Sequence, residues 1–206
     1  MTAETVPDYV GPQAVRLRPN KPNFKNRTLE LPADVLPIIA VDPGGVTGWS
    51  LLVLKRKVLE REVFSHPLEM ILRTKVQWNH GQIDCKDDED WGVYQLRKII
   101  DQWPSAAIVF ESFYVRQMGA DLSPVRITAV VQHHLWFHGR TMMQQQASMA
   151  KRMSNERLKM LGCYTSAGGL EHARDADRHA IMTVRRCMEK NSAAMKAVLW
   201  PHIYGS

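Results

Sequence analysis

Residues 38–49 read Ile-Ile-Ala-Val-Asp-Pro-Gly-Gly-Val-Thr-Gly-Trp, a short apolar run that leads directly into a Pro-Gly-Gly turn. Branched apolar residues bounded by turn residues are typical of a buried central strand. Trp49–Leu54 predicts a second strand, so the two strands form a hairpin around the turn. Asp42 stands at the end of the first strand, where a carboxylate is either a turn residue or part of a site.

Downstream of this hairpin, the pattern of apolar residues predicts further strands and helices. We expect a third strand in Lys55–Phe64, irregular structure over residues 65–90, a helix over Asp90–Trp103, a strand over Ala106–Phe110, a helix over Pro124–His138, a strand over Thr141–Gln146, short helices over Ser148–Lys151 and Ser154–Gly162, and a long helix over Ala173–Lys190. This order predicts an α/β fold, a mixed five-stranded sheet flanked by helices.

The 206 residues suit one domain with an additional arm. Residues 1–34 contain five prolines and a stretch of five basic residues without an acid, which predicts a basic arm. Such an arm is either a solvated tail or a segment that contacts phosphates or a partner subunit. We expect the folded domain to span residues 35–192 and a C-terminal extension to span residues 193–206.

Composition restricts the classes of function. The net charge of +6 is compatible with a polyanionic partner, although a soluble protein with spare basic residues has the same balance. The three cysteines lack CxxC spacing, which argues against a disulfide framework or a zinc ribbon and fits a reducing cytosol. We find no signal peptide and no apolar stretch near 18 residues, so we expect a cytoplasmic protein that does not enter a membrane.

Three acidic residues occur at positions from which their side chains could lie close together in the fold. Asp42 ends the first strand, Glu111 follows the strand over Ala106–Phe110, and Asp177 lies on the last helix. Strand ends of an open α/β sheet border the crevice where ligands bind, and acids buried there need a compensating charge. A pair of Mg²⁺ ions would supply that charge and stabilise an in-line phosphoryl displacement. The three acids together therefore favour a phosphodiesterase, although each alone is weak evidence.

Three segments resemble RuvC-type Holliday junction resolvases of the RNase H-like superfamily. Ile38–Trp49 resembles the opening of that family, with its Asp-Pro-Gly turn followed by Thr-Gly. Ala107–Tyr114 is similar to the second family segment, which has a Glu at a strand end, and Asp175–Ile181 resembles the C-terminal helix that supplies the last acids. Order and spacing agree from about residue 36 to about 190, and the chain looks closest to the phage-encoded branch, whose members act in a bacterial cell or a phage-infected host.

The resemblance implies an RNase H-like fold, a homodimer, and incision of branched DNA, most of all four-way junctions, that depends on Mg²⁺ or Mn²⁺. Asp42, Glu111 and Asp177 match the family's metal ligands and catalytic acids.

The fourth ligand is an open question. The family has an acid or a histidine three residues before the last Asp, and here that residue is Arg174. Asp175 is the favoured fourth ligand and His172 the other candidate. Two residues on a regular helix are about 200° apart, so Asp175 and Asp177 diverge unless the helix begins near Asp175.

The resemblance also suggests residues that contact DNA. Tyr114 stands where the family often has an aromatic residue that acts on bases near the branch point, although a core aromatic is the other interpretation. Basic residues before and along the last helix could contact phosphates, with a solvated helix face as the alternative for the last two: Lys151, Arg152, Arg174 and Arg178.

Other classes of protein share parts of this sequence pattern. Actin-like ATPases share this sheet and open with an Asp-x-Gly-x-Thr loop that Asp42–Thr47 partly imitates, but they need two such domains, and 206 residues are too few. No GxxxxGK[ST] loop is present. A nuclease of the same fold that cuts flaps, single strands or RNA–DNA hybrids would have the same ligands, so the sequence leaves it open. The intact acids argue against a catalytically silent DNA-binding module.

Overall fold

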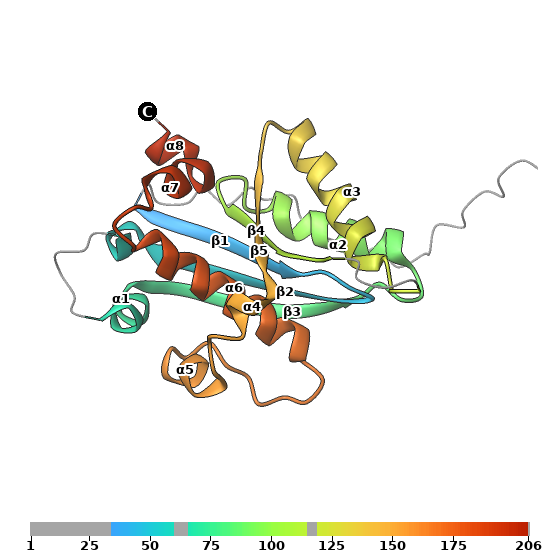
Figure 1. The fold of residues 1–206 in the computed structure, drawn as a ribbon, viewed down its shortest axis with the longest axis horizontal. Helices are drawn as coiled ribbons and strands as arrows, with labels where there is room; N and C mark the ends of the chain where they lie inside the picture. The colour runs from blue at the N-terminus through green and yellow to red at the C-terminus, as the bar shows by residue number, and fades with distance from the viewer. Residues whose placement is uncertain (1–33, 60–65, 115–118, 206) are drawn as a thin grey trace, which may run out of the picture.

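The computed structural model describes residues 34–59, 66–114 and 119–205. The described residues form one five-stranded sheet in the order β3-β2-β1-β4-β5 (Figure 1). Its strands are β1 (Val35–Asp42), β2 (Val46–Lys55), β3 (Lys75–Asp84), β4 (Ala107–Ser112) and β5 (Met142–Gln146). The predicted N-terminal arm lies outside the described residues, apart from Asp34.

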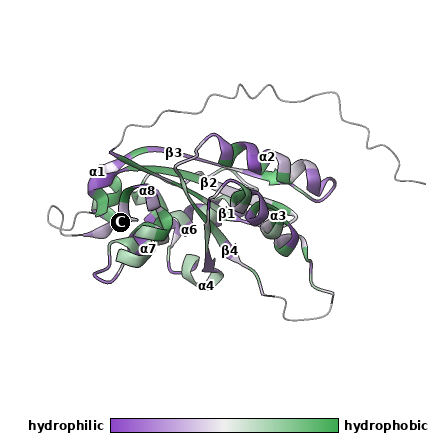
Figure 2. Ribbon diagram, turned by 90° about the horizontal axis from the view of Figure 1, so that it is seen from above, coloured by the Kyte–Doolittle hydropathy of each residue, from purple (hydrophilic) through white to green (hydrophobic). Residues whose placement is uncertain are grey.

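The sheet is mixed, as the sequence predicted. β1 and β2 form the antiparallel hairpin around the Pro-Gly-Gly turn, and β3 pairs antiparallel with β2. β4 lies parallel to β1, and β5 lies parallel to β4. The central strands are hydrophobic along most of their length (Figure 2), as expected of strands that are buried on both faces.

The third strand is not where the sequence predicted it. Within Lys55–Phe64, residues Arg56–Leu59 form a 3-10 helix, and residues 60–65 lie outside the described part. The strand is instead β3, within a stretch that was expected to be irregular. β3 is an edge strand composed largely of polar residues, so it lacks the apolar run by which the central strands were predicted.

Helices cover both faces of the sheet. α2 (Glu89–Asp101) and α3 (Ser123–Phe137) pack on one face. The other face is covered by α1 (Pro67–Thr74), α4 (Ala147–Ala150), α5 (Asn155–Met160), α6 (Glu171–Cys187), α7 (Ala193–Leu199) and α8 (Pro201–Tyr204). α6 crosses this face over β1 and β2 (Figure 1), so its side chains can reach the ends of the central strands.

The C-terminal residues pack onto the same domain. Trp200 is fully buried in the core beneath α6, and its Nε1 donates a hydrogen bond to the carbonyl oxygen of Pro37 at 3.3 Å. All three cysteines are free thiols. In the described ranges, no helix combines the length and the apolar character that crossing a bilayer requires.

Candidate active site

Two acidic side chains lie next to each other at the carboxyl ends of the central strands. Val41 of β1 is paired with Phe110 of the parallel strand β4, and the next residues are Asp42 and Glu111. Adjacent positions of paired strands point to the same face of a sheet. Ala40, two residues before Asp42, packs in the core beneath α6. Both carboxylates therefore lie on the face that α6 covers.

Gly48 allows α6 to begin directly against the sheet. It is paired with Asp42 in the β1–β2 hairpin. A Cβ atom at Gly48 would lie 2.0 Å from the carbonyl oxygen of His172 and 2.7 Å from the backbone nitrogen of Ala173. Both are backbone atoms, so no side-chain rotation could relieve the contact. The glycine thus lets the first turn of α6 lie beside Asp42.

A side chain from a distant strand caps this first turn. Leu170 at the N-cap of α6 makes no side-chain cap hydrogen bond. Instead, Oε1 of Gln82 on β3 accepts hydrogen bonds from the backbone nitrogens of His172 (3.0 Å) and Ala173 (3.2 Å), while its Nε2 donates to the carbonyl oxygen of Gly169 (2.7 Å). The first N–H groups of a helix have no partner inside the helix, so Gln82 determines where α6 begins.

Asp42 is in direct contact with the start of α6. Its Oδ2 lies 2.7 Å from Nδ1 of His172. Burial raises the pKa of Asp42 to about 6; the hydrogen bond from His172 acts in the opposite direction, and the carboxylates of Glu111 and Asp175 raise the pKa further. Asp42 is thus a buried acid near two other carboxylates and a histidine.

His172, Asp175 and His179 lie on one side of α6, because residues three, four and seven apart share a helix face. The helix begins at Glu171 rather than at the expected Ala173. Asp175 therefore lies on a regular helix between two histidines whose side chains contact the strand acids. The structure brings Asp42, Glu111, Asp175 and His172 to the same end of the sheet.

Asp177 points elsewhere, contrary to the expectation that it joins Asp42 and Glu111. It is 1% exposed, and its two carboxylate oxygens accept hydrogen bonds from Nε1 of Trp78 (2.8 Å) and pair with Nδ1 of His80 (2.7 Å), both on β3. Burial raises its pKa, and the hydrogen bonds from His80 and Trp78 oppose that shift. The two-residue offset from Asp175 turns Asp177 to the opposite side of α6, toward the edge strand.

His179 supports Glu111, a role that the sequence reasoning missed. It is fully buried, with Nε2 at 2.6 Å from Oε2 of Glu111 and Nδ1 at 2.6 Å from Oε1 of Gln145. Gln145 Nε2 in turn donates to Thr183 Oγ1 at 3.4 Å, so Gln145 links His179 to a second residue of α6. A histidine seven residues after His172, which is about two helical turns, was the available sequence signal.

Arg174 and Arg178, which were predicted to contact DNA, form contacts with other residues of the chain. Arg174 donates to the carbonyl oxygens of Thr165 (3.4 Å) and Ala167 (3.2 Å), and its guanidinium lies over the ring of Tyr164. Arg178 pairs with Asp175 and donates to the carbonyl oxygen of Met153 at 3.0 Å. In this conformation both residues organise the segment before α6 rather than present free groups to a phosphate strand.

The other residues expected to contact DNA are exposed. Tyr114 follows β4 and is 62% exposed, so it is not a core aromatic. Lys151 and Arg152 are exposed at the end of α4. All three side chains are accessible to a macromolecular ligand.

The donor set suits a divalent cation, although no three His, Cys, Asp or Glu side chains in the described part form a ready-made metal site. Carboxylate oxygens are the ligands that Mg²⁺ and Mn²⁺ prefer, and imidazole is an additional donor. The pKa of Asp42 is raised partly by Glu111 and Asp175, and a bound cation would relieve that repulsion. The chemistry of these four side chains therefore fits a metal.

The sheet order and the crossing of α6 over β1 and β2 define an RNase H-like fold. The solved structures that share it include RuvC of Thermus thermophilus in complex with Holliday junction substrate, with a TM-score of 0.51 and 11% identity over 73% of this chain and 94% of that chain. A second Thermus thermophilus RuvC structure has a TM-score of 0.50 and 12% identity over 73% and 95%. The sequence matches no protein-family model and no curated protein.

Proposed function

We propose that this chain is a divalent-metal-dependent endonuclease that cuts branched DNA, with the four-way junction as its main substrate. The observation that supports this most directly is the group of acids at one end of the RNase H-like sheet, Asp42 beside Glu111, with Asp175 near enough to raise the pKa of Asp42. The likeness to a RuvC structure that contains Holliday junction substrate adds support for branched DNA.

The proposed ligands are Asp42, Glu111, Asp175 and His172. This set replaces Asp177 by His172, because the carboxylate of Asp177 is already occupied by Trp78 and His80. His172 and Asp175 also have the three-residue spacing that the resemblance led us to expect for the last two ligands.

The bound Mg²⁺ or Mn²⁺ supplies an activated water and charge stabilisation for phosphodiester hydrolysis. The chain's own residues hold and orient the donors. His172 directs Nδ1 to Asp42, which leaves Nε2 available. His179 and Gln145 restrain Glu111 from behind. Such supporting hydrogen bonds fix the orientation of ligand side chains.

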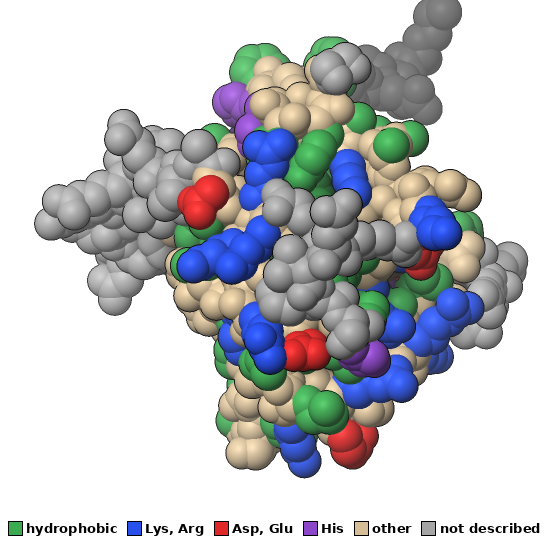
Figure 3. Space-filling view, turned by 90° about the vertical axis from the view of Figure 1, so that its left-hand side faces the viewer, with side chains coloured by type: hydrophobic (Ala, Val, Ile, Leu, Met, Phe, Trp, Pro, Cys, Tyr) green, Lys and Arg blue, Asp and Glu red, His purple; other side chains and the backbone are tan. Residues whose placement is uncertain are grey.

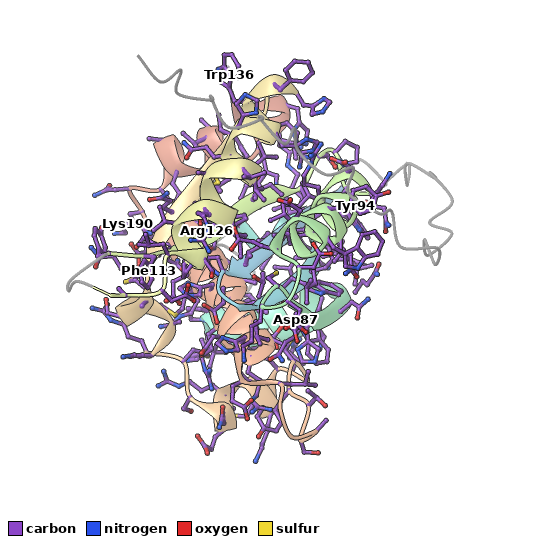
Figure 4. All side chains as sticks on the ribbon, turned by 90° about the vertical axis from the view of Figure 1, so that its right-hand side faces the viewer. Asp87, Tyr94, Phe113, Arg126, Trp136 and Lys190 are labelled. Carbon is purple, nitrogen blue, oxygen red and sulfur yellow. The ribbon has the colours of Figure 1, made fainter. Side chains whose placement is uncertain are left out.

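The homodimer is also part of the proposal, and α3 supports it. One side of α3 packs on the sheet through Ile127 and Val131. Its outer side also presents large apolar residues to solvent: Leu122, Val125, Val130, Trp136 and Phe137. Trp136 is 72% exposed and points away from the domain (Figure 4). A helix that is apolar on both sides normally packs against something on each side.

A cleavage assay tests the nuclease proposal. Purified protein is incubated with labelled four-way junction, flap, single strand, duplex and RNA–DNA hybrid, each with Mg²⁺ or with EDTA. We expect paired symmetric nicks in the junction with Mg²⁺ only. Preferential cutting of the hybrid, or no cutting of any branched DNA, contradicts the proposal.

Sedimentation tests the dimer. We expect the wild-type chain to sediment as a dimer and Trp136→Arg as a monomer, while Val198→Arg on α7, also an exposed apolar position, remains dimeric. A wild-type monomer, or equal effects of the two variants, contradicts the assignment of the dimer surface to α3.

A further inference from the structure

Four arginines line one cleft at the far end of α6. The cleft has a volume of about 340 Å³ and lies between α1, the α4–α5 segment and the last turn of α6. Arg152 and Arg157 come from the α4–α5 segment, while Arg185 and Arg186 come from α6. We refer to these four residues as the arginine cleft.

The arginine cleft has a large excess of positive charge. Within residues 34–59, 66–114 and 119–205, none of its four guanidinium groups has a carboxylate within 4.0 Å. The guanidinium of Arg157 donates to the carbonyl oxygen of Arg152, at 3.1 Å, and that of Arg185 contacts the sulfur of Met182, at 3.7 Å. Glu189 is the one acid among the lining residues.

Helix electrostatics alone do not account for this cluster. Cations in the last turn of a helix interact favourably with its C-terminal carbonyl groups, which is a sufficient reason for Arg185 and Arg186. Arg152 and Arg157 belong to a different segment, and their convergence on the same cleft adds two more charges. The side of the molecule that carries α1 and the C-terminal end of α6 has Lys and Arg side chains over much of its surface (Figure 3).

We propose that the arginine cleft binds a phosphodiester of the DNA substrate, away from the bond that is cut; this rests on the proposed nuclease function. Guanidinium groups pair with phosphate oxygens through two parallel hydrogen bonds. Apolar methionine side chains in the lining, such as Met182, offer a surface for the sugar.

The position of the cleft predicts which phosphate it binds. Arg186 lies fourteen residues beyond His172 on α6, which is about 21 Å at 1.5 Å per residue. Successive base pairs of a DNA duplex are about 3.4 Å apart along its axis. A DNA arm that extends along α6 therefore brings a phosphate of one of its two strands into the cleft about six base pairs from the cut.

The binding test uses the full chain with EDTA, so that no cleavage occurs. Anisotropy of a labelled four-way junction is measured at several salt concentrations for the wild-type chain, R185Q/R186Q, R152Q/R157Q and the control K190Q/K196Q. The control removes the same charge outside the cleft lining. Arg185 and Arg186 are half-buried, so R185Q/R186Q can disturb folding. Arg152 and Arg157 are exposed, so R152Q/R157Q avoids that effect.

We expect each cleft variant to bind roughly tenfold more weakly than the control and to lower the salt slope by about one to two. Uncharged methylphosphonates in both strands about six base pairs from the cut should weaken junction binding by the wild-type chain and leave binding by R152Q/R157Q unchanged. Cleft variants that bind the junction as tightly as the control overturn the proposal. So does a result in which the cleft variants bind a poly-glutamate peptide more weakly but bind the junction normally. Absence of junction cutting by the wild-type chain with Mg²⁺ counts against the nuclease function instead.

Discussion

Nδ1 of His172 lies 2.7 Å from Oδ2 of Asp42, a contact that joins the start of α6 to the end of β1. The two residues are 130 positions apart in the chain. The contact depends on Gly48, which allows the close approach of backbone atoms, and on Gln82, which caps the first turn of the helix.

Removing a strand acid should abolish cleavage and preserve binding. We expect Asp42→Asn and Glu111→Gln to cut a four-way junction roughly a thousandfold more slowly or worse, because lost cation binding removes several kcal/mol of transition-state stabilisation. Junction affinity with EDTA should change little, because basic residues supply it. Asp87→Asn, an exposed acid in the loop before α2, is the matched control. Cutting at the wild-type rate by either variant would show that the site is elsewhere.

Asp175 and Asp177 should behave differently when each is replaced by Asn. Asp175→Asn should lose Mg²⁺-dependent cutting and keep its stability. Asp177→Asn should lower the free energy of unfolding by about 1–3 kcal/mol, because it weakens the hydrogen bonds that the fully buried Asp177 side chain makes with Trp78 and His80. Urea unfolding and Mn²⁺ titration separate the two effects. A stable Asp177→Asn protein that fails to bind Mn²⁺ would restore Asp177 as a ligand.

Glu111 should hold a cation less well without His179. We expect His179→Leu to bind Mn²⁺ roughly tenfold more weakly, since supporting hydrogen bonds orient metal ligands. His179→Gln should recover part of the affinity, because its amide can still donate to Glu111. His202→Gln on α8 provides a control. Calorimetric titration with Mn²⁺ measures the affinity, and equal values for all three variants would refute the positioning role.

The response to a cation should depend on pH through Asp42. Its pKa is raised from 3.8 to about 6, so below about pH 6 a cation must displace a proton from the metal-free protein. We expect Mg²⁺ to raise the Tm clearly above pH 7 and very little near pH 5. In the metal-free protein, the contribution of Asp42 to stability is present below about pH 4 and is lost as the pH rises through about 6. An Mg²⁺ effect on Tm that is independent of pH contradicts this.

Gly48 should not tolerate a side chain. We expect Gly48→Ala to lower the free energy of unfolding by about 2 kcal/mol or more, since its Cβ would overlap the backbone of His172. The displaced helix should also lose junction cutting. Gly168→Ala, where a Cβ meets nothing within 4 Å, should leave both unchanged. Unfolding in urea compares the two, and equal stabilities would mean that α6 is not held against β2 as described.

Much of the fold could be predicted from the sequence because its central elements have strong local patterns. The apolar runs of β1 and β4 and the Pro-Gly-Gly turn predicted the hairpin and the strand ends that hold Asp42 and Glu111. β3 was missed because neither of its faces is consistently apolar. Its inward face contains Trp78 but also the polar residues His80 and Gln82. These inward side chains form hydrogen bonds with α6, and the local sequence pattern does not predict such long-range contacts.

The helical part of the site was harder to predict. The identity of the residues on the inner face of α6 depends on its rotation, and that rotation is set by Gln82 and by the pair that His80 forms with Asp177. These contacts join segments about 90 residues apart or more. The sequence therefore identified α6 and named Asp175, with His172 as the alternative, but it also placed Asp177 beside Asp42 and Glu111, whereas the buried Asp177 contacts Trp78 and His80 on β3.

The capping of α6 by β3 has a consequence for the order of events during folding. β1 and β4 can bring Asp42 and Glu111 together, but α6 is oriented by residues of an edge strand that contributes no proposed ligand. A slip of β3 by one residue would turn Trp78, His80 and Gln82 to the opposite face of the sheet. The proposed site is thus incomplete until this outermost strand has paired in register, because the first turn of α6 is held by Gln82.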